Sequence, residues 1–254
     1  MRQTGAIALN TFKETIRDRV LGIIVLFALF MIVASLWLGS ISLGEEARVM
    51  KDFGLVAVTF FGLVVAAFIA AGLVHKEVER RTVFVLFSKP VSRAAFIAGK
   101  FLGLGLTMAV VIAGMGLFLF LAVWVIEGAP SWLLLAAIAL IYVQLIVVVA
   151  VTIFFSTLGS AILASVLGIC VFVFGQLSTN VLSLSRLGQN AITEAFSWVV
   201  FILIPNFTAV DAKPAVVGEQ AIDWGSIALW CGYLAAYVVA VLLLAAFAFR
   251  RREF

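Results

Sequence analysis

Residues 132–155 read WLLLAAIALIYVQLIVVVAVTIFF, and this run decides the fold because no charged side chain interrupts it. A helix rises about 1.5 Å per residue, so about 20 apolar residues cross a hydrocarbon core of about 30 Å. The charge-free stretch around the run extends over 128–185, which is too long for one crossing. Small turn-forming residues, STLGS at 156–160, divide it. The sequence therefore predicts two consecutive spans, at 132–155 and 161–182.

Four further charge-free runs are long enough to cross a membrane, at 20–43, 53–74, 101–126 and 224–249. Hydrophobic residues make up 65% of the 254-residue chain and charged residues 12%, against about 45–50% and 25% in soluble domains. This composition excludes an ordinary water-soluble globule. We expect an all-α integral membrane protein, a single transmembrane domain over 1–254 with six transmembrane helices.

Lysine and arginine set the expected orientation of these spans. Most of the 17 basic residues lie at the N-terminus, between spans two and three, and at 250–252. Because cytoplasmic loops are enriched in basic residues, we expect these three places, and hence both termini, in the cytoplasm. A short apolar piece at 195–204 ends at Pro205 and is too short to cross. It predicts a re-entrant or interfacial helix on the outer side.

Three segments lie outside the expected spans. In 2–19, apolar residues recur at helical spacing, which favours an amphipathic elbow helix on the membrane surface over a solvated, frayed lead-in. In 76–93, charged residues precede an apolar stripe, which either docks on a partner protein or lies on the membrane surface with its charges near lipid phosphates. The outer connection, 183–223, is long enough to act as a lid or gate, or as a structural cap.

The chain shows few signs of catalytic chemistry. It has no GxxxxGK[ST] motif, so ATP binding through a P-loop is not expected. Its one histidine, His75, lies at the expected end of span two, where neither a metal site nor a Ser–His pair is indicated. The pair Glu45-Glu46 is interpreted as solvated charge. No ionisable residue falls within an expected span, which argues against a proton-coupled pump.

Neutral polar residues in spans four and five are the candidates for a translocation path or a subunit interface. The alternative is that they bond to neighbouring helices or face lipid head groups. The candidates are Gln144, Thr152, Gln176, Ser178, Thr179 and Asn180. Gly99 and Gly103 form a GxxxG pattern at the start of span three, which predicts close helix packing there.

Five stretches of the chain resemble one family. They are ALNTFKETIRDRV at 8–20, EVERRT at 77–82, SKPVSR at 88–93, FSTLGS at 155–160 and IPNF at 204–207. The family comprises the membrane subunits of ABC-2 type transporters, in the bacterial branch whose permease and ATPase are separate chains. One departure is Arg81, where many members carry glycine, and it affects the expected boundary of a helix there.

The resemblance implies a function that the residues alone left open. A permease subunit would export a substrate across the bacterial cytoplasmic (inner) membrane as a homodimer, while a separate ABC ATPase subunit binds ATP and Mg²⁺. This chain would hold no cofactor and would not be an enzyme. Its 76–93 segment would supply a cytoplasmic coupling helix, with ATPase-coupling residues Glu77, Glu79, Arg80, Arg81, Val83, Phe84, Leu86, Phe87, Pro90 and Arg93. The alternative is a membrane component of an ABC-type assembly or cofactor-maturation system without bulk transport.

Overall fold

The structure, a computed structural model, describes residues 2–16, 21–39, 45–79, 93–187, 204–218 and 222–251. All regular elements in these ranges are helical. They are α1 (Arg2–Thr15), α2 (Leu21–Gly39), α3 (Glu46–Glu79), α5 (Arg93–Glu127), α6 (Trp132–Leu158), α7 (Ala161–Leu187), the 3-10 turn η2 (Thr208–Val210), α9 (Lys213–Val217) and α10 (Trp224–Arg251).

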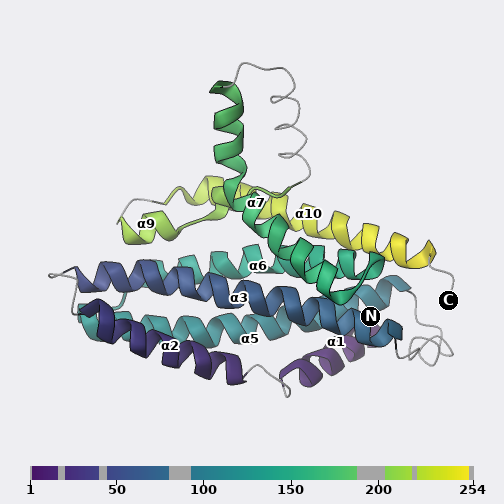
Figure 1. Cartoon of the computed structure of the whole chain (residues 1–254), viewed down its shortest axis with the longest axis horizontal. Helices are drawn as coiled ribbons and strands as arrows, with labels where there is room; N and C mark the ends of the chain where they lie inside the picture. Colours follow the sequence, from purple (N-terminus) through teal and green to yellow (C-terminus); the bar gives the residue numbers. More distant parts are fainter. Residues whose placement is uncertain are drawn as a thin grey trace.

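Helix α6, formed by the apolar run described above, lies at the centre of the bundle and packs against α3, α5, α7 and α10 (Figure 1). Leu134, Ile141 and Leu145 on this helix are fully buried. Most of this helix is buried and its exposed residues, such as Trp132 and Leu135, are apolar, so it has no polar face and its sequence carries no charge.

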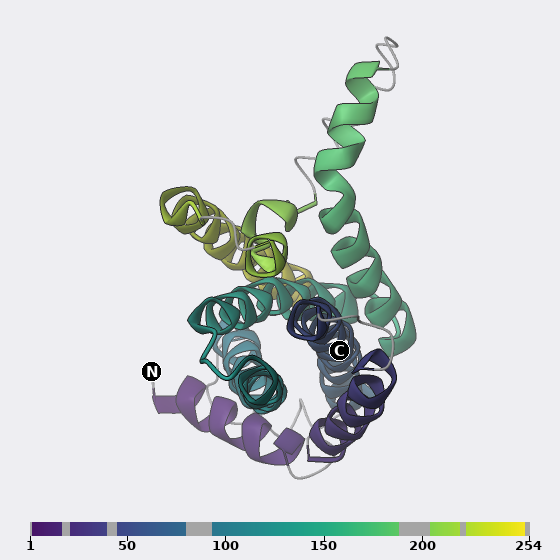
Figure 2. The same cartoon turned by 90° about the vertical axis from the view of Figure 1, so that its left-hand side faces the viewer.

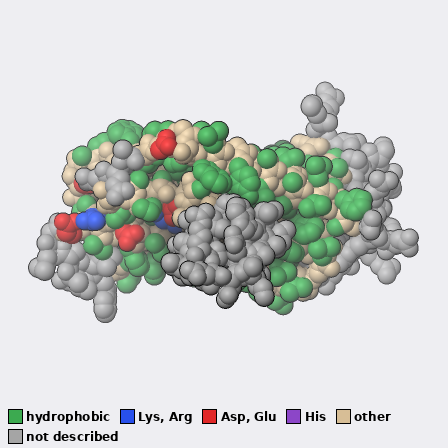
Figure 3. All heavy atoms as spheres, turned by 90° about the horizontal axis from the view of Figure 1, so that it is seen from above, with side chains coloured by type: hydrophobic (Ala, Val, Ile, Leu, Met, Phe, Trp, Pro, Cys, Tyr) green, Lys and Arg blue, Asp and Glu red, His purple; other side chains and the backbone are tan. Residues whose placement is uncertain are grey.

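Five helices in the described part of the chain are long and apolar enough to cross a membrane. Their spanning segments are Glu46–Gly72, Ala94–Glu127, Trp132–Leu158, Ala161–Ser178 and Trp224–Phe249. Helix α2 contributes a shorter apolar stretch, Gly22–Ala34. On the face shown in Figure 3, apolar side chains cover much of the described surface and charged side chains gather toward the α9 side. The expected all-helical membrane protein is confirmed, and the count of six spans stays a prediction.

Some helices are longer than the sequence indicated. Helix α3 begins at Glu46 instead of residue 53 and continues to Glu79, so it takes in most of an expected outer loop and the start of the 76–93 segment. A carboxylate in the first turn of a helix is favourable because it faces the positive end of the helix dipole. Helix α5 begins at Arg93, before the expected span at 101–126, which agrees with Ser92 as the expected cap of a helix that continues into this span.

The chain turns sharply at both ends of α6. Before it, Gly128 has a φ of 72°, a left-handed conformation that suits glycine, and its N–H bonds to the carbonyl of Trp124 at the end of α5. After it, the chain turns between Leu158 and the start of α7, within the STLGS cluster. The backbone N–H of Leu163 lies 3.4 Å from Oγ of Ser160, which precedes α7.

Helix α1 packs on α5 through the two glycines of the GxxxG pattern. A Cβ added at Gly99 would lie 2.9 Å from Cβ of Ile7, and one added at Gly103 would lie 2.6 Å from the carbonyl oxygen of Ala8. The predicted close packing is therefore confirmed, with the N-terminal helix as its partner. The elbow role of α1 stays a prediction, and residues 17–20 lie outside the described residues.

The two ends of the bundle differ in what they contain. At one end, called the α1 end here, α1 begins, α3 and α10 finish and α5 starts (Figure 1). At the other, called the α9 end, α9 lies beside the start of α3. Figure 2, which views the molecule from the α9 end, shows α7 projecting away from the other helices. The short helix expected at 195–204 falls almost wholly outside the described residues.

Candidate functional site

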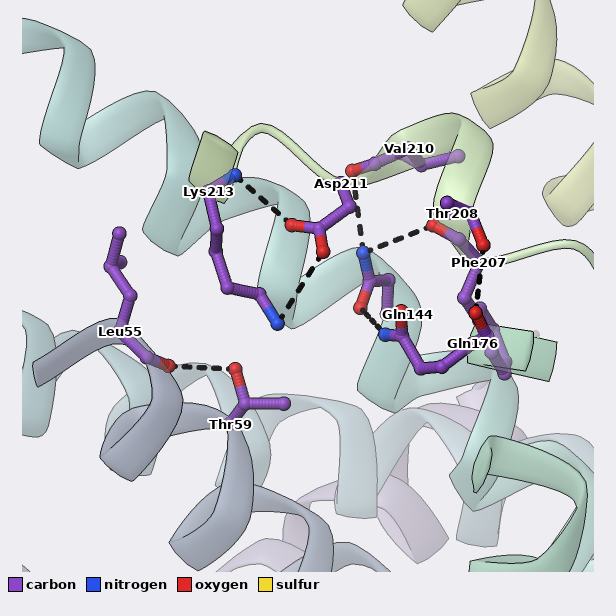
Figure 4. A network of polar contacts seen from close by, with 9 residues as sticks. All are labelled: Leu55, Thr59, Gln144, Gln176, Phe207, Thr208, Val210, Asp211 and Lys213. Atoms are coloured by element: carbon purple, nitrogen blue, oxygen red, sulfur yellow. Dashed lines mark hydrogen bonds and ion pairs between the residues drawn. The ribbon is translucent and has the colours of Figure 1, made fainter. Parts of the chain in front are cut away.

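Two of the polar residues singled out in the sequence, Gln144 on α6 and Gln176 on α7, meet inside the bundle (Figure 4). Nε2 of Gln176 donates to Oε1 of Gln144 over 3.1 Å. Nε2 of Gln144 in turn lies 3.4 Å from the carbonyl oxygen of Phe207 and 3.3 Å from that of Val210. Gln144 is only 1% exposed. The two carboxamides therefore join two helices to the segment that follows α7 along the chain.

That segment, residues 204–218, is called the outer segment here, after the outer connection expected at 183–223, and Phe207 is one of its fully buried residues. The ring of Phe207 is fully buried and lies 5.3 Å from the ring of Phe172, centroid to centroid. A Cβ added at Gly175 would lie 2.4 Å from Cδ2 of Phe207, so only glycine leaves room for the ring on α7. The backbone N–H of Phe207 donates to the carbonyl of Gly175, and the Thr208 hydroxyl donates to that of Gln176.

Among the described residues, the other four candidate polar residues make no hydrogen bond to the side chains of Gln144 or Gln176. Thr152 is fully buried at the crossing of α6 and α7, and its Oγ1 has no hydrogen-bond partner among the described residues. Ser178 bonds within its own helix, to the carbonyl of Gly175. Thr179 and Asn180 belong to α7, but their side chains lie outside the described residues. A role of the set in a path or an interface stays a prediction.

Charged residues of the outer segment also turn toward the bundle. Asp211 and Lys213 form an ion pair of 3.6 Å, with side chains 17% and 16% exposed. The backbone N–H of Lys213 donates to the same carboxylate over 3.0 Å. In Figure 4 the ammonium of Lys213 points toward the part of α3 that carries Thr59. The outer segment is thus bonded and packed to α3, α6 and α7 together.

A second ion pair lies at the α9 end, between Lys51 of α3 and Glu127, the last residue of α5. The two side chains are 8% and 30% exposed, so the lysine is the more buried partner. The sequence had assigned Lys51 to an outer loop, and the structure places it inside α3, because that helix begins earlier. The pair lines an open hollow of about 370 Å³ together with Glu45, Ala47, Arg48, Val217 and Gly218.

At the α1 end, the residues expected to couple to an ATPase are only partly described. Glu77 and Glu79 belong to the last turns of α3, and Arg93 is the first residue of α5. Arg80, Arg81, Val83, Phe84, Leu86, Phe87 and Pro90 lie outside the described residues. Near these residues, the rings of Phe96 and Phe249 stack with their centroids 6.0 Å apart. Nζ of Lys100 lies 5.8 Å from the centroid of the Phe96 ring. This stack joins the start of α5 to the end of α10.

Sequence reasoning missed Phe207, Asp211 and the Lys51–Glu127 pair. Phe207 lies in the IPNF stretch that resembles the family, but only Lys51 left a signal in the helical pattern. Lys51 lies in register with the apolar face of α3, four residues before Leu55 and seven before Val58, which are both fully buried. A helical wheel continued toward the N-terminus from residue 53 would have placed it inward. Phe207 and Asp211 lie in irregular backbone, where periodicity gives no direction.

The long apolar helices and their largely apolar buried core define a multi-pass transmembrane protein. The model of one family, described as ABC-2 family transporter protein, matches residues 5–254. The chain belongs to this family, and it is a transmembrane permease component. A comparison with curated proteins found no match.

Proposed function

We propose that this chain is the permease subunit of an ABC-2 type transporter that exports a substrate across the bacterial cytoplasmic membrane. A separate ABC ATPase would bind ATP and Mg²⁺ and supply the energy, and two copies of the permease would enclose the path. The observation that carries the proposal is the family match over 5–254, on a chain with long apolar helices and no P-loop motif.

The arrangement of the helix ends supports an attachment point for the ATPase at the α1 end. The 76–93 segment joins the end of α3 to the start of α5, so a protein that grips it pulls on both helices. Because Ile7 and Thr11 of α1 pack directly on the two glycines of α5, α1 follows any displacement of α5. A cytoplasmic α1 end also agrees with the basic residues at both termini.

The proposed mechanism is alternating access. ATP binding closes the dimer of ATPase subunits, the 76–93 segment transmits this closure, and α2, α3 and α7 rearrange around the axis of the permease dimer. In this mechanism the apolar stripe from Val83 to Phe87 is the surface that enters the ATPase.

The test is to replace Phe84 and Leu86 together by Asp and to co-purify the ATPase. An apolar contact buried on binding does not tolerate two carboxylates, so we expect loss of the complex and of permease-stimulated ATP turnover. Ser88→Asp is the control, because it adds a negative charge beside the stripe without removing apolar surface. Unchanged complex yield and unchanged turnover in the double variant would contradict the proposal.

A further inference from the structure

We propose that Gln144 and Gln176 form a latch that opens and recloses during transport, and that its opening releases the outer segment from α6 and α7. The inference rests on the proposed function, because only alternating access requires α7 to move while α6 stays. The hydrogen bond between the two carboxamides joins these helices directly. Any displacement of α7 along or away from α6 therefore has to break this bond.

The outer segment depends on contacts with other helices for its position. Its regular structure is limited to the three residues of η2 and the five of α9, so few backbone hydrogen bonds hold it internally. It is instead docked by buried apolar side chains, Phe207, Val210, Ala212 and Val216, and by bonds to α6 and α7. A segment of this kind can leave its site as a unit without unfolding a helix.

The hydrogen bonds that Gln144 donates are long enough to break readily. Its Nε2 lies 3.4 Å and 3.3 Å from the two carbonyl oxygens, beyond the usual 2.9–3.0 Å for such bonds. Interhelical hydrogen bonds in membrane proteins contribute little each, which suits a contact that forms and breaks repeatedly. Neutral carboxamides also separate inside a membrane without exposing a charge to lipid.

Gln144 is the positioning residue of the latch, since it connects three partners. Removing its carboxamide leaves two backbone carbonyls without this donor and Gln176 without this acceptor. Removing the carboxamide of Gln176 deletes only one of the three bonds, since Thr208 bonds to the main chain of Gln176 and not to its side chain. The two positions should therefore differ in the size of their effect.

The experiment measures how often the outer segment leaves its site. Val210 is a fully buried side chain of the segment itself, so Val210→Cys reacts with a maleimide only while the segment is released. The native Cys170 and Cys231 are first replaced by Ala, and the permease is reconstituted with its ATPase in lipid nanodiscs. Modification of the permease chain is followed by mass spectrometry for the parent and for the Gln144→Leu and Gln176→Leu variants.

Tyr142→Phe is the matched control. It removes a side-chain to main-chain hydrogen bond from the same helix, the 3.2 Å bond from the Tyr142 hydroxyl to the carbonyl of Gly105, without touching the outer segment. A second probe, Ala67→Cys, reports loosening of the whole bundle, because Ala67 is fully buried in α3. Both controls are run with the same reagent and lipid.

We expect Gln144→Leu to speed labelling of Val210→Cys by about 25-fold, since it removes three hydrogen bonds and each lost bond shifts the opening equilibrium by about threefold. Gln176→Leu should raise the labelling rate about threefold, and Tyr142→Phe should leave it unchanged. Equal rates in the Gln144→Leu and Tyr142→Phe proteins would overturn the latch. A parallel rise at Ala67→Cys would also overturn it, because release would then reflect general loosening.

Addition of ATP tests whether the latch belongs to the transport cycle. With Gln144 and Gln176 intact, ATP and Mg²⁺ should raise the rate at which Val210→Cys is labelled. ATP without Mg²⁺ should leave this labelling rate at the value measured when no ATP is hydrolysed. If the complex forms and hydrolyses ATP but labelling stays constant, the latch proposal fails and the proposed function stands. If the Phe84 and Leu86 double variant binds the ATPase normally, the proposed function fails instead.

Discussion

The α9 end and the α1 end are held together by different kinds of contact. In the half of the bundle toward the α9 end, polar side chains reach between elements, as Gln144 does to the outer segment and Lys51 does to Glu127. At the α1 end, α1 lies on α5 with glycine between the two backbones. There Thr11 packs on Gly103 through its carbon atoms, and at the crossing of α6 with α7 the Thr152 hydroxyl faces Gly168. Both threonine hydroxyls are buried and have no hydrogen bond among the described residues.

This difference separates contacts that can exchange from contacts that stay. A hydrogen bond or ion pair can break and find another partner or water at modest cost. A glycine contact depends on shape, and a shift by a fraction of a helical turn puts side chains where no space exists. The α9 end therefore suits a part that opens, and α1 with α5 suits a part that moves as one body.

The largest effect is expected when the glycine contact of α1 is filled. Gly103→Leu places a side chain where Cβ alone would lie 2.6 Å from both the Ala8 carbonyl oxygen and Cβ of Thr11. Forcing atoms into a packed contact costs about 1–3 kcal/mol or more, so α1 should detach or the protein lose stability. The measurement is the midpoint of heat-induced loss of monodisperse protein in detergent. Gly232→Leu on α10, where no atom lies within 4 Å of the added Cβ, should leave the midpoint unchanged.

The next effect is an asymmetry within the Lys51–Glu127 pair. Glu127→Gln leaves the more buried ammonium without its anion, whereas Lys51→Met leaves a carboxylate that is 30% exposed and can reach water. We expect the free energy of unfolding to fall by about 2 kcal/mol for Glu127→Gln and by about half of that for Lys51→Met. The first variant loses more because it leaves the more buried of the two charges unpaired. Urea titration in the same detergent compares the two variants, and the reverse order would show that Lys51 reaches water.

The sequence allowed the helices to be predicted far better than the contacts between them. An uncharged run such as 132–155 can only be buried or face lipid, so length and composition suffice to place a helix there. Close packing at Gly99 and Gly103 was also predictable, because a small residue one turn from another leaves a flat strip on a helix. The helix that packs on these two glycines was not predictable, since a flat strip accepts any helix.

Only part of the candidate site could be predicted from the sequence. Gln144 and Gln176 stand out because carboxamides are unusual in apolar runs. Their shared partners, the carbonyls of Phe207 and Val210, are backbone atoms in an irregular segment. Such atoms leave no trace in the residue pattern, because any residue type supplies a carbonyl. The helix boundary at Glu46 was missed for a related reason: the partner that keeps Lys51 inside α3 lies on another helix.

A smaller effect, of opposite sign, is expected at Thr152. Its Oγ1 is buried without a hydrogen bond among the described residues, and Thr152→Val removes the hydroxyl while keeping the branched shape. Removing an unsatisfied buried group should raise stability by up to about 1 kcal/mol. Thr59→Val is the matched control, because the Thr59 hydroxyl donates to the carbonyl of Leu55 over 2.7 Å. If both variants lower the thermal midpoint alike, the Thr152 hydroxyl has a partner.

The smallest effect is a pH dependence at the start of α10. The hydroxyl of Ser226 donates to the Asp223 carboxylate over 2.6 Å, and the backbone N–H groups of Ser226 and Gly225 donate to it as well. These bonds, the Ser226 hydroxyl first, hold the pKa of Asp223 below its usual value. A folded-state pKa below the unfolded one means that the stabilisation is complete above the ordinary aspartate range and is lost as pH falls through the lowered pKa.

Acidification should therefore loosen the first turn of α10 only at a pH below the usual range for aspartate. Asp223→Asn keeps one acceptor for the cap and should remove this pH dependence, while Ser226→Ala should move it to higher pH because the strongest of the bonds is gone. Hydrogen exchange at the start of α10, followed from neutral to acidic pH, is sensitive enough for a change at one helix end. Identical pH profiles for the parent and the Asp223→Asn variant would show that the carboxylate does not cap the helix.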